Sequence, residues 1–121
     1  MRNYKNIEAH KISDELVLEL YKTTKSFPKE ELYSLTSQLR RAAASIPTNI
    51  AEGASRQHTK EFLQFLYISR GSIAEVEYLI SLSDRLGYLE DSQSKKIKFL
   101  IFRASKCLYY LIRAVETELK D

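Results

Sequence analysis

The sequence is short of the residues that interrupt or cross-link a chain. Its 121 residues contain three glycines, two prolines, one cysteine and no tryptophan. The single cysteine, Cys107, cannot form a disulfide within the chain, and no cysteine and histidine residues have the spacing of a zinc site. The low glycine and proline content excludes collagen-like and linker-rich proteins. We therefore expect one globular domain over residues 1–121, reduced and cytoplasmic, with no metal and no cofactor.

Long hydrophobic runs are also missing. The longest stretch without a charged residue, residues 42–51, contains Pro47 and is much shorter than the roughly 20 apolar residues of a membrane span. The first residues lack the apolar core of a signal peptide. We expect no contact with a membrane.

The sequence also lacks the motifs that indicate common enzyme chemistry. It has no phosphate-binding glycine loop, no Gly-x-Ser-x-Gly elbow and no His-Glu-x-x-His zinc motif. Neither His10 nor His58 follows a glutamate at the spacing that di-iron bundles use. Cys107 lies among apolar residues of a predicted helix, where a thiol usually packs without reacting. We expect no catalytic residue and no enzyme activity.

The apolar residues recur with a helical period along the whole chain. Glycine, proline and capping residues divide this pattern into four helices, and the boundaries that they predict are Phe27-Pro28, Gly53-Ala54-Ser55, Thr59, Leu86-Gly87-Tyr88 and Asp91 or Ser92. Pro28 suits the first turn of the second helix. Short connections between helices of similar length favour antiparallel neighbours. We therefore predict an all-α protein, an antiparallel up-down-up-down four-helix bundle.

Each predicted helix has one apolar seam that faces the core. The seams are Ala9, Ile12, Leu16, Leu20 and Thr23; Leu32, Leu35, Leu39, Ala42 or Ala43, Ile46 and Ile50; Phe62, Leu66, Ser69, Ile73, Val76, Ile80 and Ser83; and Ile97, Ile101, Ala104, Leu108, Leu111 and Val115. Pro47 lies within the second seam, where it removes a backbone hydrogen bond. Because the apolar period continues to Ile50, we predict that the second helix kinks at Pro47 rather than stops.

The third and fourth helices carry a second apolar stripe that a lone bundle would expose. The stripe on the third helix is Phe65, Ile68, Ser72, Leu79, Leu82 and Leu86, and that on the fourth is Phe99, Phe102, Tyr109 and Tyr110, with Lys106 and Arg113 among them. Exposed apolar surface of this extent usually marks an interaction site. We predict a homo-oligomer with these stripes, Phe65, Ile68 and the four aromatics above all, at its interface. The alternative is that helix twist buries both stripes in one thick core.

The net charge is only +3, yet the basic residues cluster along the chain. The clustered residues are Arg40, Arg41, Arg56, Lys60, Lys95, Lys96 and Lys98. The three lysines lie near the start of the fourth helix, where the helix dipole disfavours cations. We take all seven as candidate phosphate contacts for RNA or DNA. The alternative is a solvated helix end that keeps the protein soluble.

Three further charged residues, Glu52, Arg70 and Glu75, have apolar or small neighbours in the sequence. We predict that they lie inside or between helices and form a buried ion pair that sets the helix register, rather than a catalytic group. With Pro47 and Gly53 they form our set of structural residues.

Several strings occur in one order along nearly the whole chain. They are residues 27–31, 35–42, 45–53, 62–66, 70–72 with Glu75, and 86–89, together with Tyr4-Lys5. The run from Pro47 to Gly53 in a helical context is the most specific of them. With these strings the sequence resembles the 23S ribosomal RNA intervening-sequence protein family, also described as S23 ribosomal protein-like or four-helix bundle proteins. His10 stands where the family pattern favours tryptophan.

The resemblance implies an antiparallel four-helix bundle that assembles into a homopentameric ring and is no enzyme. Genes of this family often lie within intervening sequences of bacterial 23S rRNA genes. Similar accessory proteins of diversity-generating retroelements suggest binding to nucleic acid and to a reverse transcriptase. We expect a non-enzymatic oligomer that contacts the phosphates of structured RNA or DNA. The alternative is a scaffold on which another protein docks, with Tyr109 and Tyr110 as anchors.

Overall fold

The computed structural model describes residues 2–120, which form four α-helices and no strand. The helices are α1 (Glu8–Thr24), α2 (Leu35–Ala54), α3 (Thr59–Arg85) and α4 (Asp91–Lys120). Two short 3₁₀ turns, η1 (Tyr4–Asn6) and η2 (Lys29–Glu31), precede α1 and α2. The all-α prediction is confirmed.

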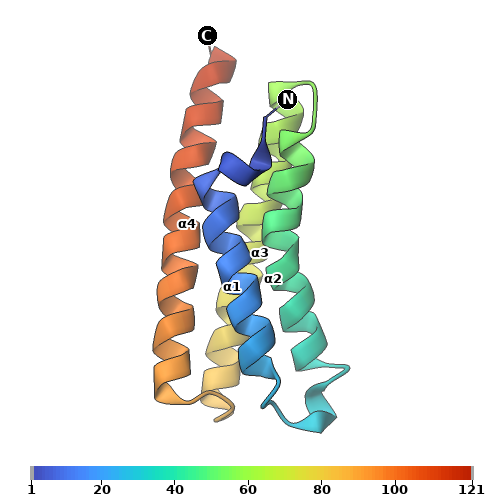
Figure 1. Ribbon diagram of the computed structural model, residues 1–121, viewed down its shortest axis with the longest axis vertical. Helices are drawn as coiled ribbons and strands as arrows, with labels where there is room; N and C mark the ends of the chain where they lie inside the picture. The colour runs from blue at the N-terminus through green and yellow to red at the C-terminus, as the bar shows by residue number, and fades with distance from the viewer. Residues whose placement is uncertain (1, 121) are drawn as a thin grey trace.

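The four helices lie side by side and enclose one core. Backbone contacts join α1 to α2, α2 to α3, α3 to α4 and α4 to α1. In Figure 1 the chain reverses its direction at each connection, so the α2–α3 connection lies at one end of the bundle and the start of α4 at the other. Segments far apart in the sequence, such as the end of α1 and the start of α4, are thereby brought together.

The predicted seams supply the core. Their largest members, Phe62, Leu16, Leu39 and Leu66, are completely buried. Burying a side chain of this size contributes roughly 1.5–3 kcal/mol to folding. Two seam residues differ from the prediction: Leu32 is exposed, and Leu111 is only half-buried, with Leu100 and Ile112 buried on α4 as well.

The predicted start of the second helix at Pro28 is wrong, because α2 begins at Leu35. Pro28 is extended (ψ 140°) and precedes η2 instead. This connection is tied to the α3–α4 connection, which lies at the same end of the bundle (Figure 1): the Phe27 and Tyr88 rings lie 5.4 Å apart, and the Tyr88 hydroxyl donates to Glu31 Oε2 at 2.9 Å. These contacts compete with a continuous helix through residues 28–34.

Pro47 and Gly53 both lie within α2. The helix continues through Pro47, which excludes a stop there, and a kink at this residue remains a prediction. Gly53 is a packing residue rather than the start of the turn, which begins at Ser55. A Cβ on Gly53 would lie 2.7 Å from Phe65 Cβ and 2.9 Å from Phe62 Cδ1. Only glycine therefore allows α2 and α3 to approach this closely.

Candidate functional site

The outer face of α4 carries a row of exposed aromatic side chains. Phe99, Phe102, Tyr109 and Tyr110 each expose between 52% and 62% of their surface. Given the helical period, their positions along α4 place them on the side of the helix opposite to the buried seam. In the single chain, large aromatic side chains thus face solvent along the outer side of α4.

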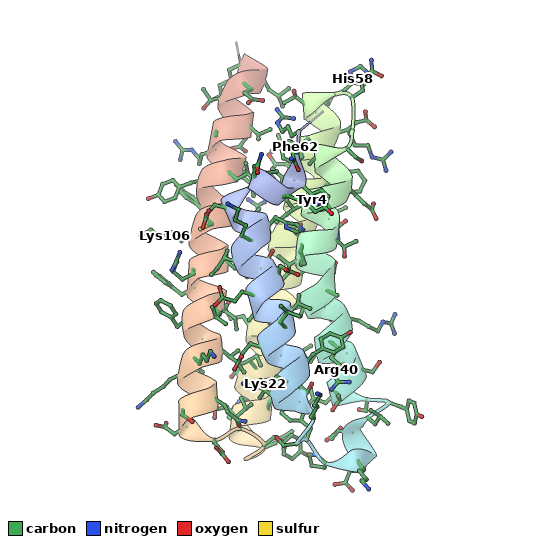
Figure 2. The ribbon with its side chains drawn as sticks, viewed as in Figure 1. Tyr4, Lys22, Arg40, His58, Phe62 and Lys106 are labelled. Carbon is green, nitrogen blue, oxygen red and sulfur yellow. The ribbon has the colours of Figure 1, made fainter. Side chains whose placement is uncertain are left out.

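Cations lie among these aromatics. The Arg113 Nη1 donates to the Tyr109 hydroxyl at 3.1 Å, and the Arg103 guanidinium lies 5.9 Å from the centre of the Phe99 ring. Lys106 is exposed, on the side of α4 away from α1 (Figure 2). The α4 stripe, as we call this surface, consists of Phe99, Phe102, Arg103, Lys106, Tyr109, Tyr110 and Arg113. Aromatic residues and arginine are the types that carry most binding energy in protein interfaces.

None of the three cations of the α4 stripe forms an ion pair within residues 2–120. The two arginines instead lie over the Phe99 and Tyr109 rings, each 5.9 Å from the ring centre, and such contacts are worth roughly 0.5–1 kcal/mol at exposed sites. The stripe therefore presents uncompensated positive charge on an apolar surface.

The second stripe of α3 is divided between the core and the surface. Ile68 is 52% exposed, whereas Ser72 and Leu79 are buried. Phe65 is half-buried, and the Arg56 guanidinium lies 4.8 Å from the centre of its ring. The thick-core alternative thus holds for the middle of this stripe, while Ile68 and Leu86 remain exposed.

The two stripes lie on different faces of the bundle. The α3 stripe faces α2, since the Ser72 hydroxyl lies 2.8 Å from that of Ser45. The side of α3 next to α4 carries other residues, among them Ala74 and Glu77, which line a groove that Tyr109 also lines. The structure therefore does not unite the six predicted interface residues into one patch.

The groove between α3 and α4 has a volume of about 260 Å³ and contains charges of both signs. Arg70, Glu77, Arg113 and Glu116 line it, together with apolar residues of both helices. The Tyr67 hydroxyl donates to Glu116 Oε2 at 2.8 Å, and this hydrogen bond raises the pKa of Tyr67. The groove borders the α4 stripe and extends the surface available to a partner.

The predicted buried ion pair is wrong, because Glu52, Arg70 and Glu75 are all exposed. Arg70 lies over the Tyr67 ring, 4.8 Å from its centre, and Glu75 lines a groove between α2 and α3. Their small neighbours Ser69 and Gly53 are buried, but adjacent residues of a helix point in different directions, so a buried neighbour does not bury the charged side chain.

Arg40 is occupied by contacts within the bundle. Its Nε donates to Thr24 Oγ1 at 2.8 Å, and its guanidinium lies 4.7 Å from the centre of the Tyr21 ring. Arg40 therefore joins α2 to α1, whereas its neighbour Arg41 is exposed.

The three lysines at the start of α4 are paired with carboxylates. Lys96 lies 3.4 Å from Glu19, and Lys98 lies 2.8 Å from Asp84. Lys95 pairs with Asp91 one turn earlier, at 3.0 Å. Two of these partners come from α1 and α3, so counting charge along the sequence alone could not reveal them.

The predicted phosphate contacts do not form one patch. Arg56 and Lys60 are exposed beside the α2–α3 connection, at one end of the bundle. The lysines of α4 lie at the opposite end, toward which Arg40 also lies (Figure 2). The bundle is about 45 Å long, as 30 residues of α4 at 1.5 Å each require.

A basic hollow at the start of α4 includes two lysines that sequence reasoning missed. Lys22, Lys25 and Lys96 line an open hollow of about 480 Å³, with Glu19 as its one carboxylate. Ser26, Ser92 and Gln93 add groups that hydrogen-bond. The predicted antiparallel arrangement was a usable signal, because it brings the end of α1 beside the start of α4.

Within residues 2–120, no three side chains of His, Cys, Asp or Glu gather as they would around a metal ion. None of the helices described there combines the length and the apolar character that crossing a membrane requires.

Comparison with known proteins identifies relatives of this chain. Residues 5–110 match the family described as 23S rRNA-intervening sequence protein. Among solved structures, the chain is similar to a protein of unknown function from the S23 ribosomal protein family of Bacteroides thetaiotaomicron VPI-5482. The TM-score is 0.79 at 24% identity, over 87% of this chain and 95% of that chain, which shows a shared fold. No curated protein matches the sequence.

Proposed function

The chain belongs to the 23S rRNA-intervening sequence protein family, and we propose that it works as a non-enzymatic, homo-oligomeric scaffold, with five subunits in a ring. The proposal rests on the exposed aromatic residues of the α4 stripe. The number five comes from the family resemblance of the sequence strings. Cells would use the assembled ring, rather than the single chain, as the surface on which a partner docks.

The α4 stripe has the size and chemistry of an interface. Residues 99–113 extend over about 21 Å of helix. The four aromatic side chains are already partly buried, so covering the rest of each contributes roughly 1–2 kcal/mol, which offsets part of the roughly 4–15 kcal/mol that association costs. The exposed apolar surface of the single chain therefore becomes a source of stability in the assembly.

Light scattering after size-exclusion chromatography tests this proposal. We expect the wild type to have the mass of five 14.1 kDa chains. Phe102→Glu places a charge in the stripe and should shift the protein toward monomer. Leu18→Glu is the matched control, because Leu18 is also exposed (65%) but lies on α1. A monomeric wild type at high concentration contradicts the proposal.

A second function, binding of structured RNA or DNA, is favoured by the basic hollow of Lys22, Lys25 and Lys96. A ring repeats this hollow in every subunit, so weak phosphate contacts add together. Arg41, Arg56 and Lys60 would contribute further contacts from the other exposed surfaces.

Fluorescence anisotropy of labelled RNA and duplex DNA across a salt series tests the second function. Phosphate binding predicts an affinity that falls steeply as salt rises. Lys22→Glu combined with Lys25→Glu should weaken it, whereas Lys11→Glu, on an exposed lysine of α1 outside the hollow, should not. Absence of binding at low salt would leave the protein scaffold as the function.

A further inference from the structure

Outward residues of α3 and α4 recur at the same seven-residue spacing and differ in the sign of their charge. Positions 68, 75 and 82 of α3 are seven residues apart and place Glu75 midway between Ile68 and Leu82. Positions 99, 106 and 113 of α4 have the same spacing and place Lys106 midway. Residues at this spacing share one helix face. The α3 positions thus place one negative charge between two apolar residues, whereas the α4 positions place Lys106 between Phe99 and a second cation, Arg113.

Glu75 and Lys106 cannot meet within one chain. Glu75 lies on the α2 side of α3, where it lines a groove of about 540 Å³ with Gln38, Arg41 and Ser45. Lys106 lies on the outer side of α4 (Figure 2). Both are exposed, and neither forms an ion pair within the described part of the chain. Each remains available to a neighbouring molecule.

Charge argues against two α4 stripes facing each other. A symmetric α4–α4 contact would bring Arg103, Lys106 and Arg113 against their own copies with no carboxylate in the stripe, and like charges at an interface are unfavourable. The face formed by α2 and α3 offers the opposite sign through Glu75, beside Ile68, which is 52% exposed; Arg41 lines the same groove on the α2 side. A second copy of this chain thus carries the complementary face.

We infer that the α4 stripe of one subunit docks on the α2–α3 face of the next, with Lys106 opposite Glu75 and the aromatic rings against Ile68, Leu82 and Leu86. The inference rests on the proposed homo-oligomer and names its contact. Because the two faces differ, the contact is head-to-tail and builds a ring or an open chain rather than a symmetric dimer.

Charge exchange is the first test. Lys106→Glu and Glu75→Lys each place like charges opposite one another, and each should weaken association at least ~10-fold in light-scattering dilution series. A double variant with both changes again has opposite charges at the two positions, with the signs exchanged, and it should assemble. Lys11→Glu and Glu15→Lys, on exposed residues of α1, are the matched controls. Failure of the double variant to recover, while circular dichroism shows a folded bundle, overturns the inference.

Mixing two blocked variants is the second test. One variant carries Phe102→Ser and Tyr109→Ser and keeps its α3 stripe; the other carries Ile68→Lys and Glu75→Lys and keeps its α4 stripe. Each alone should be monomeric, and an equimolar mixture should form a 1:1 dimer, because one intact face of each kind is present. A mixture that stays monomeric overturns the head-to-tail contact. A monomeric wild type overturns the proposed function as well, so the two failures are distinguishable.

Discussion

Single charged side chains divide into those that hold the bundle together and those that remain open to a partner. Asp84 accepts hydrogen bonds from Lys98 at 2.8 Å and from Ser94 at 3.0 Å, and both bonds lower the pKa of its carboxyl. Arg40 is similarly engaged with Thr24. Arg41 is exposed. A partner of the bundle therefore meets a smaller set of cations than the sequence contains.

Asp84 should make stability depend on pH. Since its pKa is lower in the folded chain, the charged form contributes stability that is fully present above the ordinary aspartate pKa of 3.8 and is lost as pH falls through the lowered value. We predict that Asp84→Asn lowers the urea midpoint at pH 7 and that the difference from wild type shrinks below about pH 3.8. Glu15→Gln, on an exposed residue of α1, is the control. A difference that is equal at both pH values contradicts the assignment.

Substitution by alanine should have opposite effects on the stability of the fold at Gly53 and at Gly71. A Cβ on Gly53 meets Phe65 Cβ and Phe62, so Gly53→Ala should destabilise the fold by about 1–3 kcal/mol through overpacking. Gly71 lies in α3 with no atom within 4 Å of a Cβ, so Gly71→Ala should stabilise by about 0.5–1 kcal/mol. Urea unfolding of both variants checks this pair. Equal effects of one sign would mean that close packing is not the role of Gly53.

At the scale of elements, the connection between α1 and α2 depends on residues far along the chain. Tyr88 follows α3, yet its hydroxyl donates to Glu31 and its ring packs on Phe27. The hydrogen bond to Glu31 raises the pKa of Tyr88. Residues 28–34 are therefore held in place by the α3–α4 connection at the same end of the bundle.

Removing the Tyr88 hydroxyl should loosen that connection selectively. We predict that Tyr88→Phe increases hydrogen exchange in residues 28–34 and leaves the middle of α3 and α4 unchanged, because the ring still packs on Phe27. In the wild type the same loosening should appear as pH rises through the raised tyrosine pKa, since the neutral hydroxyl is the donor. Exchange that increases evenly over the whole chain would contradict a local role.

The buried seams were predictable because the apolar residues of each helix recur with the helical period. Leu16 of α1 and Leu66 of α3 are examples, and both are fully buried. The start of α2 was not predictable, because it depends on Tyr88, 57 residues after its partner Glu31. The same limit applies to the candidate site. The exposed aromatics of α4 follow from local spacing, whereas the partners of Lys96 and Lys98 and the lysines of the hollow come from other helices.

For the molecule as a whole, the distribution of surface favours assembly before any other function. The α4 stripe presents aromatic and cationic side chains together, and the α2–α3 face presents Glu75 beside apolar residues. In a ring the basic hollow at the start of α4 would recur once per subunit. Binding of nucleic acid or of another protein would then be a property of the ring, because a single chain offers only a few weak contacts.

Hydroxyl-radical footprinting reports on whether a second copy covers the α4 stripe. We predict that Phe99, Tyr109 and Tyr110 are protected from oxidation in the wild type and become labelled in Phe102→Glu. In Leu18→Glu they should stay protected. Equal labelling of these three residues in the wild type and in Phe102→Glu, as their exposure in the single chain would allow, would mean that no second copy covers the α4 stripe.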